Sequence, residues 1–562
     1  MKETTTIALF AIFPFLAQAQ QTVGLFLNDS LSYNGYTLFA PSTYRVTYLI
    51  DNCGEIVNTW DSEYSPGMSV YLLENGNLLR TARLNGAFTG GGVGGRIELF
   101  DWEGNLLWAY NYATNAHQQH HDIEPLPNGN ILVLAWELVP QANAVAAGRK
   151  PTSIPQAGIW SEHIVELEPF GTDGANIVWE WHVWDHLVQD FDSGKNNFGV
   201  VNQHPELINL NYTGITAGGP GGGSAQTDWL HCNSIDFNPE MNQIMLSSRV
   251  FSEIWVIDHS TTTAEAASHT GGAYSRGGDL LYRWGNPAAY NRGEAGDQQF
   301  FGQHDAHWIP PGRPDAGKVM VFNNGLGRPD GDFSTVDIIE PPLAPNGYYL
   351  LVGASPFGPE MPFWSYGAGA GEFFFSGNTS GAQRLPNGNT LVCTGADGHF
   401  FEINALDDLL VWDYINPVRA FGPLAQGQVP ANNGVFRADR YPVDYAGFAG
   451  KDLTPTVPVE VNPLPSNCQI FNTATATHPQ RFETGIVSIY PNPATDQFFI
   501  ENESGEALSI RVVDVAGRIV FSTNSTEKMI HCNAEIWNKG MYFAYLANPS
   551  GDRFFVQKII KL

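Results

Sequence analysis

The stretch that decides the fold is a short hairpin that recurs along the chain, as YLLENGNLLRT at 71–81, EPLPNGNILVL at 124–134 and QRLPNGNTLVC at 383–393. In each copy Asn-Gly separates two apolar segments, and both turn residues tolerate the positive φ of a tight hairpin turn. Degenerate copies lie at 236–249 and 308–325. The repeat therefore predicts a series of antiparallel strand pairs.

A second kind of hairpin alternates with the first and ends in tryptophan. Its copies are RVTYLIDNCGEIVNTW (45–60), RIELFDWEGNLLWAY (96–110), HIVELEPFGTDGANIVWEW (163–181), the segment 254–285, FFEINALDDLLVWDY (400–414) and a weaker sixth copy at 336–351. Two hairpins make a four-stranded blade, and six blades fit about 430 residues. We therefore predict an all-β fold, a six-bladed β-propeller. Because the first copy is an outer hairpin, we expect the last blade to close with a strand from the other end of the chain.

The tryptophans of the second hairpin recur at one position, so we expect them to pack between blades. They are Trp60, Trp108, Trp179, Trp284 and Trp412. The segments 139–158, 185–211 and 212–226 interrupt the repeat. In propellers such insertions gather on one face, which makes these three candidate lids over a central site.

The composition restricts the class of partner. The formal net charge of −29 excludes nucleic acid, because phosphate binding needs a basic surface. An anionic substrate would need local arginines, and the acidity itself is typical of a solvated surface on an exported protein. Residues 1–19 read as a secretory signal, and no later apolar run is long enough to form a transmembrane segment. Five cysteines allow at most two disulfides, whose pairing stays open, and no cysteine spacing indicates a zinc site.

Histidines occur at one place in the repeat. Five residues before the leucine of the turn stand Met68, His121 and Ser380, and the degenerate copies hold His231 and His304 within one residue of that place. These positions head the innermost strands, where all blades converge on the channel axis, so the three histidines are expected to share one site. Histidine is the usual acid, base and ligand near neutral pH.

Two arginines follow in matching places, Arg249 after the His231 strand and Arg328 after the His304 strand. Guanidinium groups bind tetrahedral oxyanions through paired hydrogen bonds, so the arginines indicate an anion pocket. Surface ion pairing is the alternative role for both.

Several segments resemble the arylsulfotransferase family. They are DWLHCNSIDFNPEMNQIMLSSR (228–249), FGQHDAHWIP (301–310), FNNGLGR (322–328), QHHDIEPLPNGNIL (119–132) and the closing QRLPNGNTLV…VWDYINP. The similarity covers about residues 40–455. It implies an exported six-bladed propeller that moves a sulfuryl group from an aryl sulfate ester to a phenolic acceptor through a covalent sulfohistidine, without a nucleotide donor or another cofactor.

The resemblance assigns roles to residues of this chain. It implies His231, His304, His121 and Arg328 as catalytic, with Arg249, His120, Asn233 and Asn324 binding the substrate. His231 and His304 take supporting acid–base roles, because the blade expected to carry the nucleophilic histidine holds Thr379 or Ser380 instead. His121 could then act as the nucleophile, and Asn323 replaces an acidic residue of the family's FDNG motif. No metal ion is assigned to the catalytic site.

The C-terminal region has a different pattern. Residues 456–484 are rich in Pro, Thr and Asn and read as a linker after a propeller spanning 20–455. From 485 to 562 short strands alternate with Gly and Asn turns, which predicts a small β-sandwich. Its segments YPNPA (490–494), VVDVAGR (512–518), KGMYF (539–543) and KIIKL (558–562) resemble the C-terminal sorting domain of the Bacteroidetes type IX secretion system. That resemblance implies the secretion machinery as a partner, export through the periplasm to the cell surface or medium, and usually removal of the tail.

Three functions follow as hypotheses. The first is an aryl-sulfate sulfotransferase acting on small molecules. The second is a catalytically degenerate propeller that binds sulfated aryl compounds or glycans at the cell surface. The third is metal binding by the histidines, with His120, His121 and Asp122 adding ligands.

Overall fold

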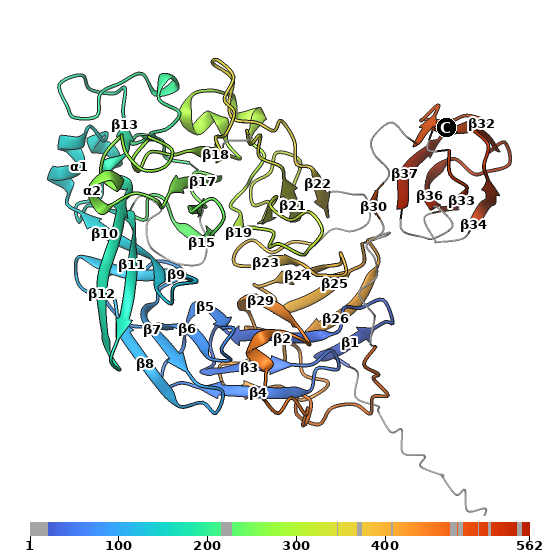
Figure 1. The fold of residues 1–562 in the computed structure, drawn as a ribbon, viewed down its shortest axis with the longest axis horizontal. Coiled ribbons are helices and arrows are strands. Elements are labelled where there is room, and N and C mark those ends of the chain that lie inside the picture. The colour runs from blue at the N-terminus through green and yellow to red at the C-terminus, as the bar shows by residue number, and fades with distance from the viewer. Residues whose placement is uncertain are drawn as a thin grey trace, which may run out of the picture.

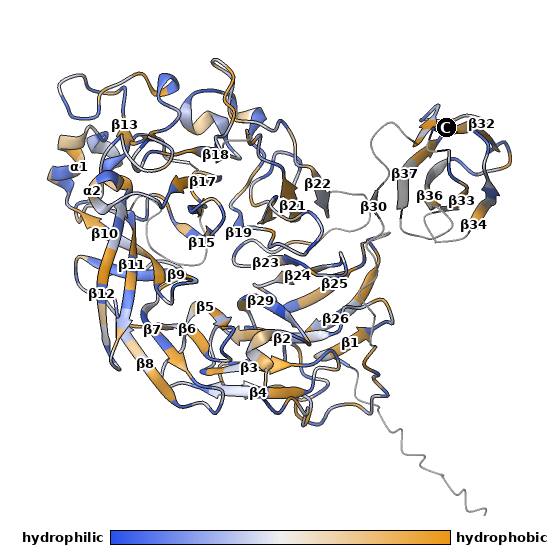
Figure 2. Cartoon of the chain, in the orientation of Figure 1, coloured by the Kyte–Doolittle hydropathy of each residue, from blue (hydrophilic) through white to orange (hydrophobic). Residues whose placement is uncertain are grey.

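The computed structural model describes residues 21–214, 227–344, 347–367, 374–405, 408–471, 480–481, 487–503, 505–514, 519–547 and 553–562. The expected signal sequence and most of the 212–226 insertion lie outside the described residues. The strands concentrate the apolar residues, whereas the connecting loops are largely hydrophilic (Figure 2). The described chain is built mainly from antiparallel sheets, as the alternating hairpins predict.

Six sheets of four or five strands lie around a common centre in the part of the chain that the structure describes (Figure 1). Four of them hold consecutive strands, written here from the centre outward. They are β9 (His117–Pro125), β10 (Ile131–Val139), β11 (Ile159–Phe170) and β12 (Gly174–His182); β5 (Pro66–Leu72), β6 (Leu78–Arg83), β7 (Gly95–Phe100) and β8 (Leu106–Asn111); β15 (Cys232–Asn238), β16 (Gln243–Ser248), β17 (Glu253–Asp258) and β18 (Tyr282–Trp284); and β19 (His304–Trp308), β20 (Val319–Asn323), β21 (Thr335–Ile339) and β22 (Trp364–Tyr366).

The other two sheets join distant parts of the chain. They are β29 (Val435–Pro442) with β2 (Gly35–Pro41), β3 (Val46–Ile50) and β4 (Ile56–Asp61), and β23 (Gly381–Arg384) with β24 (Thr390–Thr394), β25 (His399–Ile403), β26 (Leu410–Ile415) and β1 (Gly24–Asn28). The expected closure by a strand from the other end of the chain is therefore confirmed, because β29 pairs with β2. A second closure, the pairing of β1 with β26, had no signal in the repeat.

The inner strands are joined in a closed circuit by hydrogen bonds that involve side chains. The donor and acceptor pairs are Tyr71 to Asp122, Ile235 N–H to Asp122, Ala306 N–H to Ser234, Ala382 N–H to Asp305, Arg440 N–H to Gln383 and Leu72 N–H to Tyr441. The circuit runs through β5, β9, β15, β19, β23 and β29 and back to β5. This arrangement is consistent with a β-propeller, in which radial closure protects the sheet edges.

The recurring tryptophans pack between neighbouring sheets, as expected. Each indole N–H donates to the next sheet or its loops: Trp60 to the Asp101 carbonyl, Trp108 to Gly174, Trp179 to the Thr261 hydroxyl, Trp284 to Pro359 and Trp412 to Asn52. The weak sixth copy at 336–351 is only half right. Its first strand is β21, but the outer strand is β22 at Trp364–Tyr366, and Tyr349 forms only an isolated bridge with Leu343.

The insertions supply short elements outside the six sheets. The helices are α1 (Gln141–Ala147) and α2 (Thr263–Ala266), with 3-10 turns at Pro151–Ser153, Val183–Asp185, Val201–Gln203, Pro287–Tyr290, Ala295–Asp297 and Ala446–Phe448. The small sheets pair β13 (Leu187–Val188) with β14 (Ile208–Asn209), and β27 (Val418–Arg419) with β28 (Gly422–Pro423). Across the described residues, no helix is long and apolar enough to cross a membrane.

After β29 the chain runs along the sheets before it reaches the tail. Thr456 N–H donates to the Ile56 carbonyl, Ile56 N–H donates to Val457, and Val461 N–H donates to Leu424. Cys468 then forms a disulfide with Cys53, while Cys232, Cys393 and Cys532 are buried free thiols. The first part of the segment 456–484 is thus attached to the propeller-like body.

The tail contains two sheets that share one apolar core. One sheet orders β30 (Gln480–Arg481), β37 (Arg553–Lys561), β36 (Gly540–Ala547), β33 (Leu508–Asp514) and β34 (Ile519–Ser525), and the other β31 (Val487–Tyr490), β32 (Gln497–Asn502) and β35 (Met529–Asn533). Phe498 and Ile500 from the second sheet pack in one cluster with Ile510 and Leu546 from the first. Two sheets that enclose a common core are the arrangement expected of a β-sandwich.

Candidate functional site

The heads of the inner strands share an unusual backbone conformation. Residues with positive φ stand there in five sheets: Met68 (121°), His121 (48°), His231 (49°), Asp305 (55°), Thr379 (52°) and Ser380 (86°). Non-glycine residues rarely adopt such angles. The strand pairing also shifts register at these places in the sheets of β5, β9, β15 and β19. A bulge of this kind redirects a side chain, so it turns the residue at this position of the repeat away from the regular strand pattern.

The imidazole rings of His121 and His231 contact each other where their two sheets meet. Their ring centroids are 4.7 Å apart and the rings cross at 73°. Burial holds the pKa of His121 well below its usual value, and the charges of His231, His120, His304 and Arg249 lower it further. His121 and His231 are thus in contact, and His304 and Arg249 lie near enough for their charges to act on His121.

His231 is oriented by a carboxylate that the sequence analysis did not assign. Its Nδ1 lies 2.5 Å from Asp228 Oδ2, and Asp228 also accepts a hydrogen bond from the Trp136 indole. Burial acts to raise the pKa of Asp228, but the charge of His231 and its hydrogen bond outweigh burial and leave that pKa below its usual value. An ionised Asp228 accepts the proton on Nδ1 of His231 and fixes the orientation and tautomer of that ring. The signal was available, because Asp228 begins the DWLH segment.

His121 ends a buried chain of hydrogen bonds. Glu162 Oε2 lies 2.7 Å from His120 Nε2, and His120 Nδ1 lies 2.8 Å from His121 Nδ1. Burial lowers the pKa of His120 to about 3 and raises that of Glu162 well above its usual value. Both directions favour the proton on Glu162; with the proton there, His120 donates from Nδ1 and His121 carries its own proton on Nε2. No sequence pattern singles out Glu162.

His304 is held in the opposite tautomer. Its Nδ1 donates to Asn324 Oδ1 at 2.7 Å, and its Nε2 accepts a longer, 3.2 Å hydrogen bond from the Thr379 backbone N–H. Burial lowers the pKa of His304 to about 3, and the charge of Arg249 acts in the same direction. His304 is thus held as the Nδ1–H tautomer, with its Nε2 lone pair accepting the longer bond from Thr379. The strand head that lacks a histidine contributes a backbone amide instead.

Arg249 adds a buried positive charge to this group of histidines, and its guanidinium has no hydrogen-bond acceptor among the described residues. Its residue is only 7% exposed, and its guanidinium makes no hydrogen bond to any described residue. Burial lowers its pKa, opposed by the charge of Asp228. A desolvated guanidinium with free donors has the chemistry that binds oxyanions in proteins.

The remaining predicted residues lie at different distances from this group. Asn324 also donates to the carbonyls of Ser376 and Thr379, which fixes its amide against His304. Asn233 donates to the Gln303 carbonyl, and its Oδ1 is buried without a partner among the described residues. His120 stacks on Trp136 with centroids 4.0 Å apart.

Arg328 is engaged away from the histidines. Its guanidinium donates to the Phe333 carbonyl and the Thr335 hydroxyl, and it lies over the rings of Phe301 and Phe333. The described contacts do not join Arg328 to any of the three histidines. Its catalytic role stays a prediction.

A glycine-rich loop that the repeat analysis passed over covers the histidines. Gly92 accepts the His121 N–H, and a Cβ on Gly92 would lie 2.1 Å from His121 Cε1. A Cβ on Gly91 would contact His231 at 3.5 Å. The loop therefore needs glycine to approach the rings, and GGGVGG at 90–95 was its signal.

Comparison with known families gives two matches. A family model described as Arylsulfotransferase (ASST) matches residues 25–341, which is more than half of the chain. A model described as a secretion system C-terminal sorting domain matches residues 488–561. The tail is therefore the type IX sorting domain that its motifs resemble, and it indicates export to the cell surface or medium.

Two similar solved structures share little sequence identity with this chain. A protein of unknown function from Bacteroides caccae is 12% identical, with 68% of this chain and 94% of that chain covered and a TM-score of 0.36. A periplasmic gluconolactonase from Pseudomonas aeruginosa is 10% identical, with coverages of 89% and 99% and a TM-score of 0.35. No curated protein matches the sequence significantly.

Proposed function

The chain belongs to the arylsulfotransferase family, and from this premise we propose that it transfers a sulfuryl group from an aryl sulfate ester to a phenolic acceptor. We assign the six sheets as six blades of one propeller within residues 20–455, with the reaction at its centre. We assign 1–19 as the signal peptide, 456–484 as the connection and 485–562 as the domain that the secretion machinery recognises.

His304 is our candidate for the nucleophile. Attack on sulfur needs a neutral imidazole with a free lone pair. The pKa of His304 is about 3, so the side chain stays neutral across the working range of pH. Asn324 holds the proton on Nδ1, and the Nε2 lone pair accepts a 3.2 Å bond from Thr379, which must break when His304 attacks sulfur. His121, the earlier candidate, has its Nε2 protonated by the Glu162–His120 chain.

His231 is our candidate for the general acid and base. The Asp228 carboxylate lies 2.5 Å from its Nδ1, the arrangement of a histidine that exchanges protons through its other nitrogen. His231 is also the more accessible partner, with 18% of its side chain exposed. Arg249 and the Nε2–H of His121 would bind the sulfuryl oxygens, where negative charge develops.

The steps balance without a cofactor. His304 Nε2 attacks sulfur, the N–S bond forms, and the S–O bond to the aryl group breaks while His231 protonates the departing phenolate. In the second half His231 takes the proton of the acceptor phenol, whose oxygen attacks sulfur and releases His304. Each half returns the groups to the state that the other half needs.

The observation that carries the proposal is the convergence of two differently partnered histidines and an unpaired Arg249. It is tested by incubating the purified chain with a chromogenic aryl sulfate, with and without a phenol. We expect phenolate release that depends on the acceptor. With donor alone, peptide mass spectrometry should find one sulfuryl group on His304.

Three variants separate the roles. His304→Asn should abolish the label and turnover, and His231→Asn should lower the rate about 10²–10⁴-fold, the usual contribution of an acid–base group. His204→Asn, at a histidine paired with Glu206 outside the site, is the matched control and should leave the rate unchanged. A label on another histidine would reject the assignment of His304.

A degenerate binding protein is the second candidate, favoured by one observation. Thr379 and Ser380 fill the strand head where a histidine was expected, and their hydroxyls bond to Asn378 and Ser376. On this alternative, calorimetry would detect an aryl sulfate bound through Arg249 with no phenolate release from any donor.

A further inference from the structure

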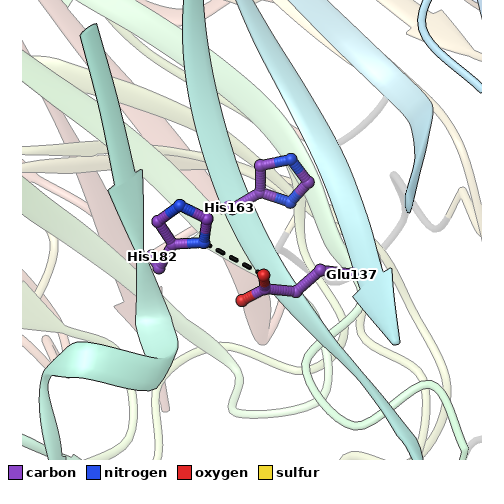
Figure 3. A group of neighbouring side chains, drawn as sticks. All are labelled: Glu137, His163 and His182. Atoms are coloured by element: carbon purple, nitrogen blue, oxygen red, sulfur yellow. Dashed lines mark hydrogen bonds and ion pairs between the residues drawn. The ribbon is translucent and has the colours of Figure 1, made fainter. Parts of the chain in front are cut away.

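The sheet of β9–β12 carries a second group of titratable side chains, on the face opposite to Glu162. Glu162 and His163 are consecutive on β11, so their side chains leave opposite faces. His163 pairs directly with His182 on β12, and Ala135 on β10 pairs with His163. Glu137, two residues after Ala135, therefore lies on the same face. Figure 3 shows Glu137, His163 and His182 turned toward one another from three neighbouring strands.

Two buried atoms of this group have no hydrogen-bond partner among the described residues. They are His163 Nδ1 and Glu137 Oε1. His163 is only 3% exposed, so water does not readily replace the missing partner. Buried polar groups without partners are rare and costly, and an ion is one explanation for them.

His163 is already fixed by a hydrogen bond to its other ring nitrogen, as metal-bound histidines are. His163 Nε2 lies 2.8 Å from the Tyr112 hydroxyl, which leaves Nδ1 pointing into the group. His182 Nδ1 lies 3.0 Å from Glu137 Oε2, and its Nε2 lies 3.6 Å from Glu180. Ligating histidines almost always bond through their other nitrogen to a hydroxyl, carbonyl or carboxylate, which fixes the tautomer.

The charge of the group suits a cation. Glu137 is the carboxylate among the three side chains, and it supplies the negative charge that a divalent cation needs.

We propose that Glu137, His163 and His182 bind a divalent transition-metal ion, and we assign it to the chemical class of zinc. The three ligand atoms lie within 4.8 Å of one another. Zinc holds nitrogen and oxygen ligands at about 2.0–2.2 Å, so small side-chain rotations bring these atoms onto one ion. Two histidines and one carboxylate with an open fourth position form a ligand set that zinc uses.

The fourth position faces solvent. A pocket of about 390 Å³ is lined by Glu137, His182, Asn143, Trp184 and Asp185. The side chains of Glu137 and His182 are 23% and 29% exposed. A water or a small anionic ligand could therefore complete the coordination and exchange with solvent.

A second cluster of possible ligands differs in its hydrogen bonding. His186, His269 and Asp279 also lie within reach of one ion. Both nitrogens of His186 are already bonded, to Asp279 and to the Ala266 carbonyl, and Asp279 accepts a bond from His269 as well. No atom of His186 is left for a metal, so this cluster serves as the matched control.

The test uses the full chain purified without a histidine tag, stripped with a chelator and titrated with Zn²⁺ against a chromophoric competitor. We expect one tight equivalent, and a tetrahedral absorption spectrum when Co²⁺ replaces zinc. Glu137→Gln and His182→Gln, at partly exposed positions, should abolish both signals. Tyr112→Phe should weaken binding about 10–100-fold, the usual cost of losing an outer partner.

Matched variants locate the ion. His269→Gln and Tyr110→Phe should bind zinc as the parent does, and so should His231→Gln at the central site. Failure of the parent to bind one equivalent would overturn the proposal, as would unchanged binding in Glu137→Gln and His182→Gln. Loss of the Co²⁺ spectrum in His231→Gln would place the ion at the centre and also overturn it. None of these readouts depends on sulfuryl transfer.

Discussion

Two buried arginines near the ring axis differ in what their side chains meet. Arg437, on β29, donates to both oxygens of Asp122 at 2.9 and 3.0 Å, to Asp305 at 3.2 Å and to Tyr71. Arg249 is as buried as Arg437, each being 7% exposed, yet its guanidinium bonds to no described residue. Burial alone lowers the pKa of an arginine; for Arg437 the surrounding acids outweigh burial and raise it, whereas for Arg249 it stays lowered.

The difference separates a structural cation from one kept for a ligand. Asp122 and Asp305 directly follow His121 and His304, so Arg437 anchors the strands that present two of the histidines. It also ties β29 to β9 and β19, elements far apart in the sequence. The side chain of Arg249 does not join any strands by hydrogen bonds among the described residues. A buried charge without a partner is costly, and such costs are typical of functional sites.

The largest effect should come from removing Arg437. Arg437→Met leaves Asp122 and Asp305 buried with reduced compensation, and breaking such a pair costs about 3–5 kcal/mol. We expect a lower midpoint in urea, monitored by tryptophan fluorescence. Arg249→Met is the matched control and should shift the midpoint little. Equal losses in both variants would show that the two arginines do not differ as described.

For activity we expect the opposite order, with a larger loss from replacing Arg249 than its small effect on stability would suggest. Arg249→Met removes the donors that we propose bind the sulfuryl oxygens, and loss of one such donor typically lowers the rate about 10²–10³-fold, which is about 3–4 kcal/mol. Sulfotransferase assays with the chromogenic donor measure this effect, and Arg249→Lys should recover only part of the rate, because lysine lacks the planar paired donors. Full activity in Arg249→Met would remove this arginine from the anion site.

The smallest effect concerns the protonation of His304, whose pKa is lowered by burial and by the charge of Arg249. The pKa of His304 is about 3 in the folded chain, below the 6.5 of an unperturbed histidine. The unfolded chain therefore binds the proton first, so this group's contribution to stability is complete above pH 6.5 and falls as the pH drops toward 3. Over one pH unit inside that window the loss is about 1.4 kcal/mol for one histidine.

His304→Gln should remove that share of the pH dependence, measured as urea midpoints at pH 5 and pH 4. His204→Gln, at a histidine with 43% of its side chain exposed, is the control and should keep the parent's slope. An unchanged slope in His304→Gln would mean that His304 titrates normally in the folded chain.

The repeat predicted the parts of the fold that depend on local chemistry. Asn-Gly turns marked the inner hairpins, and the recurring tryptophans pack between sheets as expected. The outer strand at Trp364–Tyr366 was missed because a long connection separates it from β21 and its segment carries no turn signal. The pairing of Cys53 with Cys468 and of β1 with β26 depends on ring closure, which no local pattern encodes.

In the candidate site, too, some residues could be predicted from the repeat and others are evident only in the folded chain. Alignment on the turn found His121, His231 and His304, because the strand heads recur at a fixed spacing. It could not find Glu162, whose role depends on its place beside His120 in the folded sheet. Nor could it rank Arg249 above Arg328, because both follow a histidine strand and only the fold shows that Arg328 is occupied by Phe333 and Thr335.

The disulfide between Cys53 and Cys468 has a consequence for proteolysis. The bond spans 415 residues, and that span includes all three candidate histidines. A single peptide cleavage anywhere between these cysteines leaves both fragments in one covalent molecule, whereas a cut after Cys468 releases the sorting domain. The oxidised protein can therefore lose its tail and still keep the two ends of the ring of six sheets covalently joined.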